Sequence, residues 1–237
     1  MQEKPIKMPP TKPAEDERKG HRKRLRDRLM KAGPDSVQEH ELLELVLFRV
    51  IPRRDVKVLA HKLINHFGDI SAVLAAPTDE LMTFKGVGER VIEEFAIIRA
   101  AALRFGQSKV LHRPVLAGWD DLLIYCRTKM AEEKIESFHV LFLDKKNRVI
   151  ADEKMGEGTI DHTPVYPREV IKRALALDAT ALIIAHNHPS GDPSPSRADI
   201  EMTMKLRDLA TGSNIVLHDH LVVARGEVLS FKQKGLL

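Results

Sequence analysis

The sequence of 237 residues contains one cysteine, Cys126. A single cysteine cannot close an internal disulfide bond, and it cannot build a zinc site from several thiolates. A reducing compartment is therefore the natural setting for this chain. Because Cys126 ends the apolar segment 122–126, we expect a buried structural thiol rather than a nucleophile.

Long hydrophobic runs are also missing. No apolar segment approaches the roughly 20 residues that a membrane-spanning helix needs. The first residues, MQEKP, do not resemble the start of a signal peptide. With 43% hydrophobic residues, the chain can still bury a core, as one large domain or two small ones. We therefore expect a soluble cytoplasmic protein with no membrane partner.

Positive charge is concentrated at one end, although the formal net charge is only +4. Residues 1–31 contain eleven Lys or Arg and five Asp or Glu, most densely at residues 18–26. Four prolines interrupt the first part: Pro5, Pro9, Pro10 and Pro13. We expect residues 1–20 to form a disordered basic tail. Such a tail can meet phosphate groups, or it can simply be solvated.

Runs of alternating β-branched residues are scarce in residues 21–106. This scarcity favours helices, so we expect a small helical domain there. Apolar residues recur at helical spacing in five segments: residues 39–48, 56–67, 70–74, 79–82 and 91–103. Residues 107–117 are expected to be a linker to a second domain.

The segment Phe84 to Arg90, FKGVGER, lies between two of these helices and resembles the helix-hairpin-helix motif. Its glycines, Gly86 and Gly88, would let the backbone turn sharply. Exposed N–H groups at the start of the following helix could hold a DNA phosphate, a contact without sequence information. Two alternatives remain open: a hairpin that contacts protein, and a tight turn that packs and binds nothing.

Residues 118–237 predict an α/β domain, a mixed sheet with helices on both faces. The expected helices are residues 120–130, 167–177 and 200–210. The expected strands are residues 138–143, 148–151, 181–185, 214–217, 221–224 and 228–231. Residues 138–143 are apolar almost throughout, as in a central strand buried on both faces.

The most informative segment is residues 186–199, HNHPSGDPSPSRAD. It follows a strand and leads through a proline-rich turn, expected to be rigid, into a helix. His186 and His188 can point to one side of the strand, and Asp199 returns in the first helical turn. Two imidazoles and one carboxylate can hold zinc and leave a fourth position for water. Two alternatives need no metal: a plain His-x-His strand, and a capping box from Ser196 to Asp199.

The same segment matches the JAMM motif, His-x-His-x7-Ser-x2-Asp, of the MPN metalloprotease superfamily, and it closely resembles the RadC family. Other matching segments are VYPRE at 165–169, LHDH at 217–220 and LSF at 229–231. The resemblance implies a three-layer MPN fold, similar to that of cytidine deaminases, although the deaminase His-x-Glu and Cys-x-x-Cys are absent. It implies zinc on His186, His188 and Asp199, and Ser196 stabilising the transition state. The letters HNH do not make an HNH nuclease, whose motif spans a long hairpin.

The resemblance also implies a distant glutamate that activates water, on the first sheet strand before an apolar residue. Glu136 matches that position. The competing glutamates are Glu132, Glu133, Glu153, Glu157 and Glu169.

Other polar residues could assist the site as ligands or as partners of ligands. They are His162, His218 and His220. Asp219, between two histidines, could orient a ligand imidazole.

Two functions from different classes follow. The first is a JAMM-type zinc hydrolase that cleaves a peptide, isopeptide or related amide bond in a protein or peptide-like substrate. The second is a non-catalytic, nucleic-acid-associated binding factor that retains the metal site. Weak DNA binding without sequence preference is compatible with both.

Overall fold

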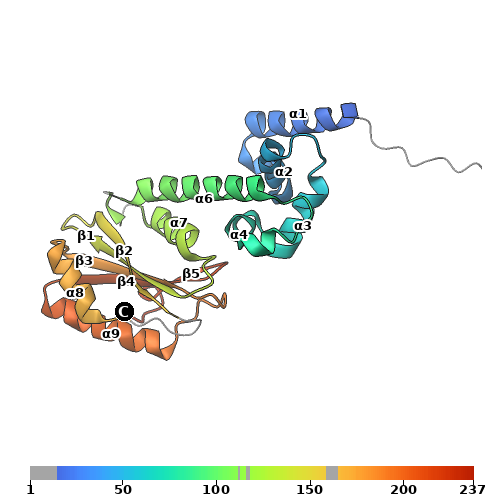
Figure 1. Ribbon diagram of the computed structural model, residues 1–237. Coiled ribbons are helices and arrows are strands. Elements are labelled where there is room, and N and C mark those ends of the chain that lie inside the picture. Colours follow the sequence, from blue (N-terminus) through green and yellow to red (C-terminus); the bar gives the residue numbers. More distant parts are fainter. Residues whose placement is uncertain (1–14, 112, 116–117, 159–164) are drawn as a thin grey trace, which may run out of the picture. The chain divides into compact units, whose positions relative to one another are not determined.

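The computed structural model describes residues 15–111, 113–115, 118–158 and 165–237 (Figure 1). The chain divides into two compact units between Phe95 and Ala96. The division lies within one long helix, and each unit has its own hydrophobic core. No helix in the described part of the chain is both long enough and apolar enough to cross a membrane.

The N-terminal unit is helical, as expected. Its elements are α1 (Glu15–Ala32), a 3-10 turn η1 (Pro34–Ser36), α2 (Glu39–Val50), α3 (Lys57–Phe67), α4 (Ile70–Ala75), α5 (Thr78–Leu81) and the first part of α6 (Glu89–Val110). The start of α2 is fixed by a capping box between Gln38 and Glu41, and Asp69 caps α4 by accepting from the Ala72 N–H at 2.8 Å. The core forms where the apolar stripes of these helices meet, around Leu43, Leu63 and Phe95.

Two expected boundaries are wrong. Residues 15–20, assigned to a disordered tail, form the first turns of α1, because the last proline before them is Pro13. Residues 107–110, assigned to the linker, are the last turn of α6. No proline or glycine interrupts these residues, and burial of Val110 in the C-terminal core stabilises the extra turn.

The turn expected at Phe84 to Arg90 connects α5 to α6. Gly86 has φ 111°, in the left-handed region that favours glycine, and an added Cβ would lie 3.4 Å from Leu59 Cδ2. A Cβ on Gly88 would meet nothing within 4 Å. The sharp turn therefore depends on Gly86 rather than on both glycines.

The C-terminal unit contains a five-stranded mixed sheet in the order β2-β1-β3-β4-β5. Its strands are β1 (Ser137–Leu143), β2 (Val149–Glu157), β3 (Ala181–Asn187), β4 (Val216–Val223) and β5 (Val228–Ser230). β3 is antiparallel to β1 and parallel to β4. All seven residues of β1 are buried, as expected for a central strand.

Helices cover both faces of this sheet, which confirms the expected fold class. α7 (Trp119–Met130) lies on one face, and α8 (Pro167–Ala176) and α9 (Arg197–Gly212) lie on the other (Figure 1). Because side chains alternate along β3, Ile183 packs in the core under α7, whereas Leu182 and Ile184 pack in the core under α8 and α9.

The expectation of two short strands at residues 214–217 and 221–224 is wrong. A single strand, β4, runs without interruption from Val216 to Val223. The residues between the two segments, His218 to His220, are polar and predicted a break. Asp219 and His220 are instead buried within the strand, where their side chains have hydrogen-bond partners.

Candidate metal centre

Side chains alternate along β3 with a period of two residues, and this places the two histidines on one face. His186 occupies the alternate position after Leu182 and Ile184, so its imidazole faces α9. His188 follows two residues later, and its N–H donates to the Val223 carbonyl at 2.9 Å, which extends the pairing with β4 beyond the end of β3. The face expected from the His-x-His spacing is confirmed.

The start of α9 brings in the carboxylate. Ser196 is the N-cap: its Oγ accepts from the Asp199 N–H at 3.1 Å, and Asp199 Oδ2 accepts from the Ser196 N–H at 2.7 Å. The capping box therefore exists, and it orients Asp199 towards the histidines. The two interpretations of Ser196 and Asp199, cap and metal site, are compatible.

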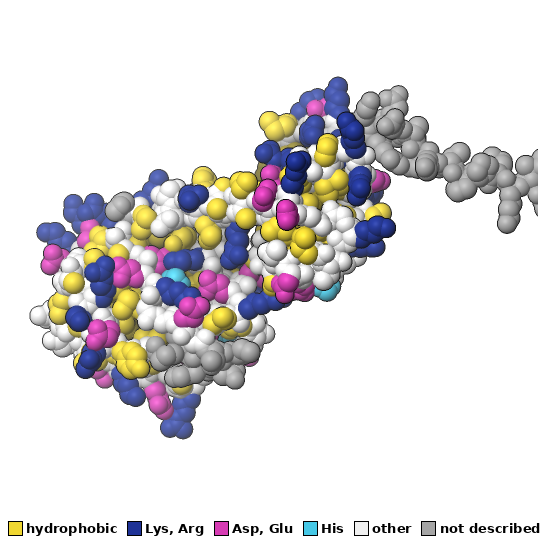
Figure 2. All heavy atoms as spheres, in the orientation of Figure 1, with side chains coloured by type: hydrophobic (Ala, Val, Ile, Leu, Met, Phe, Trp, Pro, Cys, Tyr) yellow, Lys and Arg dark blue, Asp and Glu magenta, His cyan; other side chains and the backbone are white. Residues whose placement is uncertain are grey.

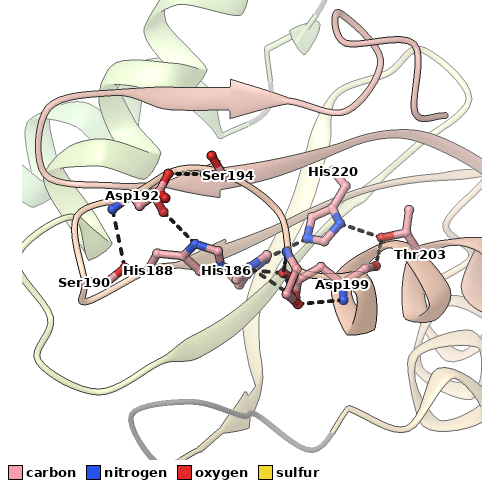
Figure 3. Close-up of polar contacts among 9 residues, drawn as sticks. His186, His188, Ser190, Asp192, Ser194, Asp199, Thr203 and His220 are labelled. Carbon is pink, nitrogen blue, oxygen red and sulfur yellow. Dashed lines mark hydrogen bonds and ion pairs between the residues drawn. The ribbon is translucent and has the colours of Figure 1, made fainter.

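The three side chains converge on one point (Figure 3). His186 Nε2 lies 2.9 Å from His188 Nε2 and 3.4 Å from Asp199 Oδ1, and His188 Nε2 lies 3.6 Å from Asp199 Oδ2. Ligand atoms around a tetrahedral zinc ion lie about 3.3 Å apart, given bond lengths near 2.0–2.1 Å. Among the residues that the structure describes, this is the one group of three or more His, Cys, Asp or Glu side chains that could hold a metal ion.

A chain of hydrogen bonds determines which nitrogen of His186 carries the proton. The Thr203 hydroxyl donates to the Asp199 carbonyl at 2.6 Å, so Thr203 Oγ1 accepts from His220 Nδ1 at 2.6 Å. His220 Nε2 then has a lone pair and accepts from His186 Nδ1 at 2.7 Å (Figure 3). His186 Nε2 is left unprotonated and aimed at the metal position, the tautomer that a metal ligand needs.

The second histidine is oriented in the same sense. His188 Nδ1 lies 2.7 Å from the Asp192 carbonyl oxygen, which can only accept. The Nδ1–H donates there, and Nε2 keeps its lone pair for a metal. The proline-rich turn after β3 thus supplies a carbonyl that fixes the tautomer.

Electrostatics favour an ionised carboxylate in this cluster. Burial alone would raise the pKa of Asp199. Without a metal, a protonated His186 or His188 can donate from Nε2 to the carboxylate, and these bonds, with that of Ser196, hold the pKa of Asp199 well below its usual range. The same hydrogen bond to Asp199 raises the pKa of His188. Burial lowers the pKa of His220 well below its ordinary value, so His220 is neutral, as the hydrogen-bond chain requires.

The other polar residues named from the sequence have different positions. Asp219 does not orient a ligand imidazole: its carboxylate accepts from Ser230 Oγ at 2.5 Å and from the N–H of Lys232 at 3.0 Å. The neighbouring His220 has that orienting role, because alternation along β4 turns the two side chains to opposite faces. His218 bonds Asn147 Oδ1 at 2.7 Å, and His162 lies outside the described residues.

The cluster lines a cavity of about 790 Å³ that also contains Ser196 and Glu136. Glu136 precedes β1, on the same face as Phe138, whose ring stacks on His186 with centroids 6.4 Å apart. Of the six glutamates considered, Glu136 is the one among the described residues that line the cavity. The other five contact Arg225 (Glu132), Ser137 (Glu133), Arg173 (Glu153), Lys154 (Glu157) and Arg168 (Glu169).

Comparisons with known proteins match both units of the chain. Residues 116–236 match the family described as RadC-like JAB domain, and residues 19–92 match the UPF0758 N-terminal domain. A UPF0758 protein of Rhodobacter capsulatus is 56% identical over 213 residues, which cover 90% of this chain and all of the relative. A UPF0758 protein of Ruegeria pomeroyi is 52% identical over 217 residues, which cover 92% of this chain and 97% of the relative.

Proposed function

We propose that this chain, which belongs to the RadC-like JAB domain family, is a zinc-dependent hydrolase that cleaves a peptide, isopeptide or related amide bond. One observation carries the proposal. His186, His188 and Asp199 present convergent ligand atoms at the wall of a cavity that also contains a carboxylate and a hydroxyl, those of Glu136 and Ser196. A metal centre that served only to hold the fold would be closed by a fourth protein ligand.

The ligand set fits zinc. Two imidazole nitrogens and one carboxylate oxygen form a three-ligand set typical of catalytic zinc, and the hydrogen-bond chain through His220 leaves the correct nitrogen of His186 available. When bound, zinc would polarise the amide carbonyl and lower the pKa of a bound water to about 7.

The chain's own residues supply the remaining chemistry. Glu136 would take the proton from the attacking water and deliver it to the leaving nitrogen. The Ser196 hydroxyl, which donates to Asp199 Oδ2 at 2.7 Å, can turn towards the carbonyl oxygen of a substrate. A donor of this kind contributes typically about 3 kcal/mol to the stabilisation of the transition state.

The surroundings of the site suit an extended substrate. A second cavity, of about 480 Å³, lies between α8 and α9, and its lining includes Leu209. Both cavities are lined by Tyr166, Pro167 and Lys205. The second cavity is shallow and open, so an extended protein or peptide-like substrate could continue along it from the metal site.

A second activity is proposed for the N-terminal unit: weak DNA binding without sequence preference. The exposed basic residues of α1 support it: Lys23, Arg24, Arg26, Arg28 and Lys31. Figure 2 shows Lys and Arg side chains gathered on the surface where α1 lies. This activity is compatible with hydrolysis by the other unit.

The hydrolase proposal is tested with a library of peptides and Lys-linked isopeptides, incubated with zinc-loaded protein and analysed by mass spectrometry. We expect cleavage by the natural chain and none by Glu136→Gln, which keeps the shape of the side chain and loses the base. Glu153→Gln is the matched control, because Glu153 pairs with Arg173 rather than lining the cavity. Cleavage that survived in Glu136→Gln but not in Glu153→Gln would show that the base is assigned wrongly.

A further inference from the structure

Asn187 separates the two histidine ligands in the sequence and points away from them. Alternation along β3 places His186 and His188 on the face of α9 and Asn187 on the face of α7. Asn187 is 1% exposed. A buried primary amide needs partners for two donors and for its carbonyl oxygen, so the contacts of this side chain show what it holds.

All of these partners belong to residues 133–137, which lead into β1 and include its first residue. Asn187 Oδ1 accepts from the Ser137 N–H at 2.8 Å and lies 3.0 Å from Ser137 Oγ. Asn187 Nδ2 donates to the carbonyls of Glu133 at 3.2 Å and Ile135 at 3.1 Å. A backbone N–H on one side and two carbonyls on the other fix the orientation of the amide.

The segment held in this way carries Glu136. The residues that bond Asn187 lie on both sides of Glu136 along the chain, at positions 133, 135 and 137. Because successive side chains alternate, holding the backbone of Ile135 and Ser137 turns Glu136 to the opposite face, where it lines the metal cavity.

We propose that Asn187 is a positioning residue that ties the segment carrying Glu136 to the strand carrying the metal ligands. The inference rests on the proposed role of Glu136 as the base. It explains why an amide stands between the histidines. Aspartate would lose both donors and place a charge against two carbonyls, and alanine would leave four polar groups of the segment without this partner.

The test uses the full chain loaded with Co²⁺, whose visible spectrum is followed against pH. A nearby carboxylate favours the protonated form of the groups around a metal. Glu136→Gln should therefore lower the midpoint of the spectral titration. Asn187→Ala should lower it as well, because Glu136 would no longer be held beside the metal. Asn187 does not bond a ligand imidazole, so the Co²⁺ affinity of Asn187→Ala should fall less than the roughly 10-fold that losing such a partner costs.

Two further variants keep the result interpretable. Ile183→Ala removes a buried side chain from the same face of β3 and should leave the midpoint unchanged. If Asn187→Ala does not accumulate as folded protein, Asn187→Ser replaces it: this variant is uncharged and loses both amide donors. The same lowered midpoint is expected.

Each outcome decides a different point. A wild-type midpoint in the Asn187 variants, beside a lowered midpoint in Glu136→Gln, would overturn the positioning role and leave the proposed function intact. An equal change in Ile183→Ala would reduce the effect to general loosening and also overturn it. An unchanged midpoint in Glu136→Gln would remove Glu136 as the base, and the positioning role with it.

Discussion

Substitution of Thr203 tests the hydrogen-bond chain that is proposed to leave His186 Nε2 unprotonated for a metal. Its side chain lies in the core, and its hydroxyl links the Asp199 carbonyl to His220 Nδ1 through two bonds of 2.6 Å. Thr203→Val keeps the volume and removes the hydroxyl. The buried His220 Nδ1–H then has no acceptor.

The size of the effect follows from the burial of His220, which is 0% exposed. A buried donor without a partner costs about 1–3 kcal/mol. His220 can avoid this cost by moving its proton to Nε2, but that nitrogen would then donate to His186 Nδ1. His186 would carry its own proton on Nε2, where the metal must bind. At 1.4 kcal/mol per factor of ten, we expect zinc affinity to fall about 10- to 100-fold, the range found for such outer partners.

The assay is competition for zinc with a chromophoric chelator at constant pH, with urea unfolding of the metal-free protein alongside. Thr203→Ser is the matched control, because it keeps the hydroxyl and removes only a methyl group. Its zinc affinity should stay near that of the natural chain. Zinc binding by Thr203→Val as tight as that of the natural chain would refute a role of the hydroxyl in zinc binding, and so would an equal loss of affinity in Thr203→Ser.

Three further predictions concern other parts of the chain. Burial opposes ionisation of Asp152, but hydrogen bonds from His139, Lys129 and Tyr125 lower its pKa from 3.8 to about 2. Its contribution to stability, about 2 kcal/mol, is therefore present above pH 4 and lost as the pH falls towards 2. Urea unfolding should show that Asp152→Asn has a lower free energy of unfolding at pH 7, and that this free energy changes less between pH 4 and pH 2 than in the natural chain. An unchanged dependence on pH would contradict the role of Asp152. Burial raises the pKa of the Cys126 thiol to about 12, so native protein should react with a thiol reagent only as fast as it unfolds, and rapid labelling would count against a buried thiol. The full chain should bind a DNA duplex weakly, with an affinity that falls steeply as the salt concentration rises. Gly86→Val should weaken this binding more than Gly88→Val, because valine is strained at the φ of 111° that Gly86 adopts. A DNA affinity that did not change with salt concentration would exclude phosphate contacts.

Local patterns in the sequence were sufficient for much of the fold. The continuous apolar run of β1 predicted a central strand, and the helical spacing of apolar residues predicted α2 and α3. The common face of His186 and His188 followed from the two-residue period of a strand. These features depend on neighbouring residues only, so they can be recognised without a tertiary structure.

The features that were missed depend on contacts between distant segments. β4 was divided because buried Asp219 and His220 look like a polar break until their partners Ser230 and Thr203 are in place. The role of His220 requires the parallel pairing of β3 with β4, a crossover that no local pattern specifies. The role of Asn187 requires the antiparallel register of β1 against β3.

His186, His188 and Asp199 are proposed to form a metal centre. The most direct measurement is the metal content of the full chain, purified without chelator and analysed for its elements, beside His188→Ala. We predict about one zinc ion per chain in the natural protein and loss of most of it in the variant, since three protein ligands hold a catalytic zinc. Natural protein that contained no bound metal, and took up no zinc on titration, would contradict the account.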